Sequence, residues 1–174
     1  MPQQVANAVT LKGNPVTLSG ADVQVGQSAP DCTLTANDLS DFKLSSLKGK
    51  KVVISVVPSL DTPVCDLQTK RFNKEATALG NDVVVLTVSM DLPFAQKRWC
   101  GAAGITRVIT LSDHRDAAFG KAYGVLIGNP PLSRLLARSI FVVDAKGTLR
   151  YKQIVSEVTT EPDYEKVLQA VKSL

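Results

Sequence analysis

The residues with the clearest chemical meaning form one segment, Pro58-Ser59-Leu60-Asp61-Thr62-Pro63-Val64-Cys65. The apolar, β-branched residues 51–57 before it predict a strand that is buried on both faces, and Pro58 ends this strand. The pair Thr62-Pro63 is typical of a helix start, so we expect a helix over residues 64–79. Cys65 then lies in the first turn of a helix, which makes it a candidate nucleophile.

A helix start favours the ionised form of a cysteine. The first backbone N–H groups of a helix have no partner within it, and the helix dipole places partial positive charge there. Both stabilise a thiolate, which is the nucleophilic form of the side chain. Full ionisation raises the reactive fraction of a thiol only about 30-fold at neutral pH. Fast cleavage of an O–O bond therefore also needs groups that polarise the bond as it breaks.

Three further residues are candidates for the environment of Cys65. Thr62 lies three residues earlier, about one helical turn, so its hydroxyl can point at the sulfur. Arg138 directly precedes the apolar residues 139–143, and it reaches the sulfur if their strand lies beside the one that Pro58 ends. Its guanidinium would then stabilise the thiolate and the charge on the leaving oxygen, although an ion pair with a carboxylate is the alternative. Pro58 would shield the pocket from water without adding an N–H group.

The other cysteines and the single histidine leave alternatives open. The odd number of three cysteines argues against a framework of structural disulfides, and without a CxxC pair a zinc site would need unusual ligands. Cys100 follows Trp99 on a predicted helix, and it either reacts with Cys65 or belongs to the core. Cys32 is interpreted as an inert core residue, and His114 as a surface or capping residue.

The remaining patterns predict an alternating α/β protein. An N-terminal hairpin is expected from residues 5–11 and 15–18 around Gly13-Asn14, followed by a loop over residues 20–31. Strands are expected over residues 82–89, 107–111, 139–143 and 148–155, and helices over residues 92–103, 117–123 and 163–174. The order hairpin, βαβαβα, ββα is that of a thioredoxin-like fold with an N-terminal β-hairpin extension. We expect one domain, residues 1–174, of which residues 1–19 form the extension.

Composition narrows the possible partners. The 174 residues are enough to bury a core without a metal or a disulfide. The net charge of +4 is scattered without a run of five like charges, and aromatic residues make up only 5%, so a nucleic-acid footprint is not expected. No apolar run approaches the roughly 20 residues that span a membrane. The N-terminus lacks the pattern of a signal peptide, so we expect a cytoplasmic protein.

The pattern PxxxTxxC, formed here by Pro58, Thr62 and Cys65, resembles the peroxidatic motif of the peroxiredoxins. The chain is most similar to the thiol peroxidase branch of that family, the atypical two-cysteine peroxiredoxins. The resemblance extends over nearly the whole chain, through VTLKGNPVTLSG, VGQSAPD, SLDTPVCDLQTKRFN, SMDLPFAQKRWC, LSDHR, FGKAYGV, LLARSIFVVD and EVTTEPDYE. The chain departs from the family pattern at Cys32 and His114, and neither position belongs to the motif.

The resemblance implies a reaction and its participants. Cys65 would be oxidised to a sulfenic acid by hydrogen peroxide or an organic hydroperoxide, which is reduced to water or an alcohol. Cys100 would then form a disulfide with it in the same chain, and Thr62, Pro58 and Arg138 would complete the site. Thioredoxin would reduce the disulfide, a homodimer would be the common assembly, and no bound cofactor is implied.

Three other functions are weaker. A thioredoxin-type oxidoreductase would need CxxC where this chain has Thr62-Pro63-Val64-Cys65. A cysteine hydrolase would need a histidine base, and only His114 is available. A redox sensor would need an extra interaction segment, which the sequence does not contain, and it would be oxidised once rather than turn over.

If the expected disulfide forms, the segments that contain Cys65 and Cys100 must move. The disulfide would close a loop of 35 residues between Cys65 and Cys100 and stabilise the oxidised chain by about 4 kcal/mol in the chain-entropy model. A helix start and a separate helix do not place two sulfur atoms at the bonding distance of about 2 Å. We therefore expect both segments to unwind locally in each cycle, and the resulting strain keeps the disulfide reducible by a dithiol.

Overall fold

The structure, a computed structural model, describes residues 4–174, with side chains from residue 9 onward. Its strands are β1 (Gln4–Leu11), β2 (Asn14–Ser19), β3 (Thr33–Thr35), β4 (Asp41–Lys43), β5 (Lys51–Val56), β6 (Val83–Ser89), β7 (Val108–Ser112), β8 (Leu126–Ile127), β9 (Ser139–Val143) and β10 (Leu149–Ile154). Its helices are α1 (Pro63–Leu79), α2 (Pro93–Ala103), α3 (Ala118–Ala122) and α4 (Tyr164–Lys172), with a 3-10 turn η1 (Leu44–Leu47).

The central element is a mixed sheet with the strand order β10-β9-β5-β6-β7-β3-β4. The strands β5, β6 and β7 run parallel, as the alternation of strands and helices requires, and α1 and α2 form the connections between them. The strand β9 pairs antiparallel with β5 and is followed by its antiparallel neighbour β10. The predicted fold class, α/β with a thioredoxin-like arrangement, is confirmed.

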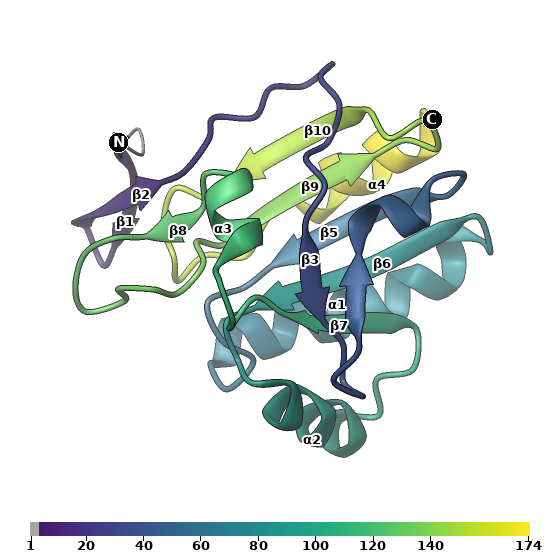
Figure 1. Ribbon diagram of the computed structural model, residues 1–174, viewed down its shortest axis with the longest axis horizontal. Coiled ribbons are helices and arrows are strands. Elements are labelled where there is room, and N and C mark those ends of the chain that lie inside the picture. The colour runs from purple at the N-terminus through teal and green to yellow at the C-terminus, as the bar shows by residue number, and fades with distance from the viewer. Residues whose placement is uncertain (1–3) are drawn as a thin grey trace.

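Helices cover both faces of this sheet. In Figure 1, α1 and α4 lie behind the sheet, α3 lies in front of it, and α2 lies below β7 at the bottom of the view. One core is formed where α1 and α4 pack on side chains such as Val53, Val85 and Ile140. A larger core on the opposite face includes Ile54 and Phe141. Alternate residues of β5 therefore face different cores, and Ser55, two positions after Val53, faces α1.

The N-terminal hairpin is present, with β1 and β2 joined through Lys12 and Gly13, both of which have positive φ. It extends into a separate three-stranded sheet because β8 pairs with β2. This small sheet lies at one end of the molecule in Figure 1. Residues 1–3 of the predicted extension lie outside the described residues.

The sequence patterns missed β3, β4, η1 and β8, which contain only two to four residues each. Segments this short have too few residues to show a period of two or of 3.6, and they form because neighbouring strands supply hydrogen-bonding partners. The predicted ends of the longer elements differ by one or two residues: for example, the strand expected over residues 107–111 is β7, Val108–Ser112. Within residues 4–174, no helix has the length and apolar character needed to cross a membrane.

Candidate active site

The start of α1 is built as the sequence predicts. Pro63 is the first helical residue, Thr62 is the N-cap residue, and Cys65 is the third residue of the helix. The Cys65 side chain is 0% exposed. Its sulfur therefore lies in the protein interior, beside the backbone N–H groups and the positive dipole end of the first helical turn.

The hydroxyl of Thr62 is directed at the sulfur instead of the helix backbone. An N-cap threonine usually accepts a hydrogen bond from a backbone N–H of the first turn, and Thr62 makes no such bond. Its Oγ1 lies 2.7 Å from Cys65 Sγ and 2.9 Å from the carbonyl oxygen of Ser59. The hydroxyl carries one hydrogen, so it donates to Ser59 when the sulfur is a thiol, and it can donate to the sulfur when that is ionised.

Arg138 reaches the same sulfur from the other side. Because β9 pairs with β5, the residue before β9 lies next to the end of the strand that leads to Cys65. The Nη2 atom of Arg138 is 3.3 Å from Cys65 Sγ, and its side chain is only 2% exposed. The sequence therefore placed Thr62, Cys65 and Arg138 correctly relative to one another.

Arg138 is held by two neutral acceptors besides the sulfur. Its Nη1 donates to Gln68 Oε1 at 2.9 Å, and its Nε donates to the carbonyl oxygen of Val158 at 2.9 Å. Gln68 is itself fixed because its Nε2 donates to Ser55 Oγ at 2.7 Å. The sequence analysis missed Gln68; the available signal was its position three residues after Cys65, on the same side of the helix.

The charge of this buried guanidinium has no carboxylate partner. Within the part of the chain that the structure describes, no Asp or Glu oxygen lies within 4.0 Å of Arg138, so the alternative of an ion pair is excluded there. A buried cation is strongly unfavourable unless an anion or several acceptors compensate it. Among the three acceptors of Arg138, the Cys65 sulfur is the atom that can carry a negative charge.

A second residue that the sequence analysis missed, Asp91, fixes the loop before Cys65. Its carboxylate accepts hydrogen bonds from Ser59 Oγ at 2.7 Å, from the backbone N–H of Leu60 at 2.8 Å and from Ser89 Oγ at 2.7 Å. Asp91 comes two residues after β6, the parallel neighbour of β5. The carboxyl ends of adjacent parallel strands meet at one edge of a sheet, and this was the available signal.

Replacing Asp91 with asparagine should slow the oxidation of Cys65 about tenfold, because an amide provides one acceptor oxygen where the carboxylate provides two. The rate is measured as the first turnover with hydrogen peroxide by stopped flow. Ser112→Ala is the matched control, since Ser112 Oγ donates to the backbone oxygen of Asp91 and not to its carboxylate. Oxidation of Asp91→Asn at the wild-type rate would contradict this positioning role.

The remaining wall of the site is apolar. Val57, Leu60 and Cys65 form a small buried cluster against which Trp99 packs. Pro58 is also buried, two residues after the end of β5. Of the two side chains that contact the sulfur, Arg138 is buried and Thr62 belongs to an exposed residue.

Cys100 lies on α2 and is not bonded to Cys65; all three cysteines are free thiols. Its sulfur is half-buried and lies 3.4 Å from the hydroxyl of Thr110 on β7. Burial raises the pKa of the Cys100 thiol, and the hydrogen bonds from Thr110 and Asn37 oppose this shift only in part. In this conformation Cys100 is a neutral thiol directed at β7.

Cys32 and His114 stand outside the site. Burial, with the nearby charges of Asp113 and Asp31, raises the pKa of Cys32 to about 12, so this thiol is neutral at physiological pH. The ring of His114 makes a hydrogen bond of 2.9 Å with the hydroxyl of Ser112. Neither residue has a contact with Cys65.

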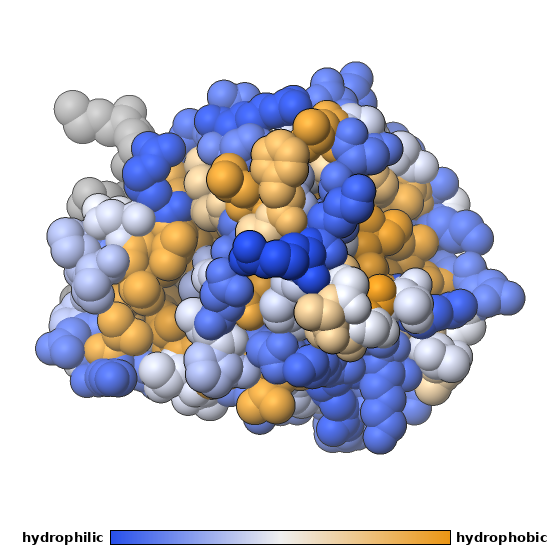
Figure 2. Space-filling model, turned by 90° about the horizontal axis from the view of Figure 1, so that it is seen from below, coloured by the Kyte–Doolittle hydropathy of each residue, from blue (hydrophilic) through white to orange (hydrophobic). Residues whose placement is uncertain are grey.

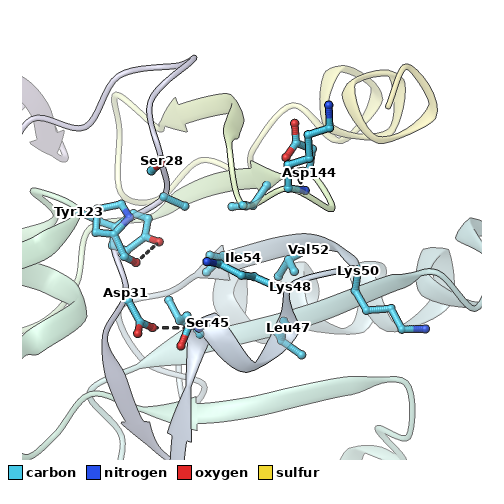
Figure 3. Close-up of a pocket in the computed structure, with 16 residues that line it drawn as sticks. Ser28, Asp31, Ser45, Leu47, Lys48, Lys50, Val52, Ile54, Tyr123 and Asp144 are labelled. Carbon is cyan, nitrogen blue, oxygen red and sulfur yellow. Dashed lines mark hydrogen bonds between the residues drawn. The ribbon is translucent and has the colours of Figure 1, made fainter.

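A pocket of the described residues lies on the other side of β5. It has a volume of about 230 Å³ and is lined by η1, by β5, and by the turn between β9 and β10. Figure 3 shows Tyr123 and Asp31 on one side of it and Asp144 on another. Its β5 residues Val52 and Ile54 face away from α1, and none of the five predicted site residues lines it. This pocket is therefore not the site around Cys65.

Fold and site define a class of protein: a thioredoxin-like α/β protein with a buried cysteine at the start of the first long helix. The family model described as Redoxin matches residues 24–168, which is most of the chain, and the chain belongs to this family. It is 57% identical over 166 residues to a thiol peroxidase of Bacillus subtilis (strain 168), covering 95% of this chain and 97% of the relative.

Other relatives agree with this assignment. A thiol peroxidase of Oceanobacillus iheyensis is 61% identical over 160 residues, covering 92% of this chain and 95% of the relative. The crystal structure of a peroxiredoxin-like protein from Aquifex aeolicus matches with a TM-score of 0.91 and 45% identity, covering 97% of each chain. A thiol peroxidase from Chromobacterium violaceum, at 21% identity and a TM-score of 0.86 over 95% of each chain, shows the same fold. The chain is an enzyme, a thiol-dependent peroxidase.

Proposed function

We propose that the chain reduces hydrogen peroxide and organic hydroperoxides to water and alcohols with Cys65 as the nucleophile. The observation that carries this proposal is the position of the Cys65 sulfur between a hydroxyl and a buried guanidinium, 2.7 Å from Thr62 and 3.3 Å from Arg138. These donors lie where charge develops as an O–O bond breaks next to the sulfur. Preorganised donors of this kind supply the acceleration that ionisation of the thiol alone does not.

In the first step the Cys65 thiolate attacks one peroxide oxygen. An S–O bond forms and the O–O bond breaks, so the sulfur is oxidised by two electrons and the peroxide is reduced. The leaving oxygen takes up a proton and departs as water or an alcohol, and Cys65 remains as a sulfenic acid. Thr62 and Arg138 stabilise the leaving oxygen as its negative charge develops. Pro58 keeps water away from the sulfur until the peroxide arrives.

In the second step Cys100 attacks the sulfenic sulfur. An S–S bond to Cys65 forms, and hydroxide leaves as water after taking up the thiol proton. The two sulfurs have separate partners in the reduced fold, Arg138 for one and Thr110 for the other. We therefore infer that the ends of α1 and α2 unwind for this step. Unwinding also removes the burial that raises the pKa of Cys100, which makes this thiol a better nucleophile.

In the third step a dithiol reductant, for which we propose thioredoxin, restores both thiols. An exchange reaction of this kind needs an accessible and strained disulfide, and local unwinding provides both properties. A cycle that depends on a reduced dithiol fits a cytoplasmic location, where such reductants are maintained. The proposal includes no bound cofactor and no nucleic-acid or membrane partner.

We further propose that the enzyme acts as a homodimer. Leu92 and Phe94, at the start of α2, are 53% and 66% exposed. Figure 2 shows the side of the molecule towards which α2 lies, with apolar side chains exposed among charged ones. Large exposed apolar side chains near the site are typical of a surface that a second copy covers.

The test of the proposed function is continuous consumption of hydroperoxide in the presence of thioredoxin, thioredoxin reductase and NADPH. Wild-type protein should consume many equivalents of peroxide. Cys100→Ser should complete the first oxidation at the wild-type rate and then lose at least 100-fold in thioredoxin-driven turnover, because its sulfenic acid has no thiol in the chain to react with. Cys32→Ser is the matched control and should turn over like the wild type.

The same experiment separates an enzyme from a sensor. Consumption of a single equivalent by the wild type, with the reductant in excess, would contradict the proposal and favour a relay of oxidation to another protein. Wild-type turnover by Cys100→Ser would leave Cys65 as the nucleophile but contradict the assignment of Cys100.

A further inference from the structure

A hydrogen bond connects α1, which carries Cys65, with α2, which carries Cys100. Its two partners are the residues next to these cysteines in the sequence. The indole Nε1 of Trp99 donates a hydrogen bond of 3.1 Å to Oδ1 of Asp66. Asp66 directly follows Cys65, and Trp99 directly precedes Cys100. The same indole packs on the buried cluster that contains Cys65. A contact between α1 and α2 thus lies one residue from each sulfur.

The carboxylate of Asp66 has a partner on each of its two oxygens. The other oxygen of Asp66, Oδ2, is paired with Lys70 Nζ at 2.8 Å, one turn further along α1, which orients the carboxylate. The Asp66 side chain is only 29% exposed. A hydrogen bond to a charged acceptor in a partly buried place is stronger than one between neutral groups in water.

The contact holds the two sulfur atoms apart. Successive residues of an α-helix point about 100° away from each other, so a cysteine and its neighbour face different directions. With Asp66 and Trp99 directed at one another, the Cys65 sulfur points inward to Arg138, and the Cys100 sulfur points to Thr110. Disulfide formation needs the two sulfur atoms about 2 Å apart. Turning Cys65 towards α2 would move Asp66 away from Trp99, and turning Cys100 towards α1 would move Trp99 away from Asp66.

We propose that the hydrogen bond between Trp99 and Asp66 is a latch that sets the rate at which the Cys65–Cys100 disulfide closes. The inference rests on the proposed function, since it concerns the step in which Cys100 attacks the sulfenic acid of Cys65. The bond is intact while Cys65 reacts with peroxide, and it breaks when the ends of α1 and α2 unwind. Asp66 and Trp99 are positioning residues, because neither forms a hydrogen bond with the sulfur of Cys65 or of Cys100.

The latch also sets the susceptibility of the enzyme to inactivation. Until the disulfide closes, the sulfenic acid can react with a second peroxide, which transfers an oxygen to give a sulfinic acid and leaves as water or an alcohol. A slower closure lengthens the time during which this competing reaction occurs. A variant without the latch should therefore close faster and resist inactivation by excess peroxide.

The test compares Trp99→Phe, Asp66→Ala, which removes the acceptor of the hydrogen bond, and the double variant with the wild type. Phenylalanine retains an aromatic ring on the Cys65 cluster and removes only the N–H donor. Closure is followed by rapid quenching with a sulfenic-acid reagent and mass spectrometry, after one equivalent of hydrogen peroxide. Both single variants should close about fivefold faster, and the double variant no faster than either, because all of them break one interaction.

Two measurements distinguish the latch from a structural role. The rate of the first oxidation should remain within twofold of the wild type in Asp66→Ala, and the sulfinic fraction after excess peroxide should fall about fivefold in both single variants. Arg71→Gln is the matched control, since it removes an ion pair of the same helix, that of Arg71 with Glu75, and leaves Asp66, Lys70 and Trp99 unchanged. Its closure should proceed at the wild-type rate.

Closure of Trp99→Phe at the wild-type rate or slower would overturn the latch, since the contact would then be neutral or would help the sulfurs to meet. Failure of the wild type to form any Cys65–Cys100 disulfide would instead contradict the proposed function. The sole tryptophan of the chain gives an independent readout. Wild-type fluorescence should change during closure and not during the first oxidation, and the opposite order would also overturn the latch.

Discussion

Replacing Cys65 with serine should reduce peroxide consumption to the rate measured without enzyme. The substitution retains the size of the side chain and its ability to hydrogen-bond with Thr62 and Arg138. A hydroxyl, however, is not a nucleophile towards peroxide at neutral pH, because it is almost never ionised there. The measurement is consumption of hydrogen peroxide with and without thioredoxin, at enzyme concentrations high enough to detect one turnover.

The control for this prediction is Cys32→Ser. The pKa of Cys32 is raised to about 12, so its removal should leave the activity unchanged. Circular dichroism and thermal unfolding show whether the Cys65→Ser variant is folded, and the conservative size of the change makes a native fold the expected result. Residual turnover above a tenth of the wild-type rate in a folded Cys65→Ser protein would contradict the role of this residue.

The second large effect is expected at Arg138. Methionine at this position has a similar length and no donors, so Cys65, Gln68 and Val158 each lose a hydrogen bond. Loss of one preorganised donor from a site of developing charge lowers rates by about 100- to 1,000-fold. We expect that loss in kcat/KM for hydrogen peroxide. The free energy of unfolding should fall by about 2–4 kcal/mol, because two buried acceptors lose their donors.

Arg138→Lys separates charge from geometry. Lysine retains the positive charge, but a single ammonium group does not donate to all three acceptors from one position. We expect a loss in kcat/KM of about tenfold to 30-fold, between the wild type and the methionine variant. The rates are measured well below the unfolding temperature of each variant. An Arg138→Met protein that is folded and within threefold of wild-type activity would show that the guanidinium contributes little to the reaction.

The part of the site that could be predicted from the sequence is the part formed by neighbouring residues. Thr62 and Cys65 are three residues apart, and the helix start at Pro63 fixes their relative position. Arg138 is 73 residues from Cys65 in the sequence. Its placement depended on the pairing of two strongly apolar strands, β5 and β9, which the patterns suggested but did not specify.

Gln68 and Asp91 were missed because their roles follow from tertiary contacts. A glutamine within a helix is ordinarily a solvent-exposed residue, and only the burial of Arg138 shows why Gln68 is 0% exposed. Asp91 could equally have been a helix-start residue before Pro93. Its three hydrogen bonds appear only when the ends of β5 and β6 are brought side by side.

The short strands were also missed because they form through contacts between distant parts of the chain. The segments β3 and β4 have three residues each, and β8 has two. The conformation of β3 and β8 is determined by pairing with β7 and β2, and that of β4 by pairing with β3. A pattern of two or three residues carries no period that would reveal it. The long apolar strands and the proline-started helices were predicted to within one or two residues, since burial and capping act locally.

The most direct test of the central claim is a peptide map of the wild-type protein after reaction with one equivalent of hydrogen peroxide, with free thiols alkylated at the end. We expect one disulfide-linked pair of peptides, containing Cys65 and Cys100, and full alkylation of Cys32. Complete loss of the peroxide with Cys65 recovered as an alkylated thiol would show that another group performs the reaction.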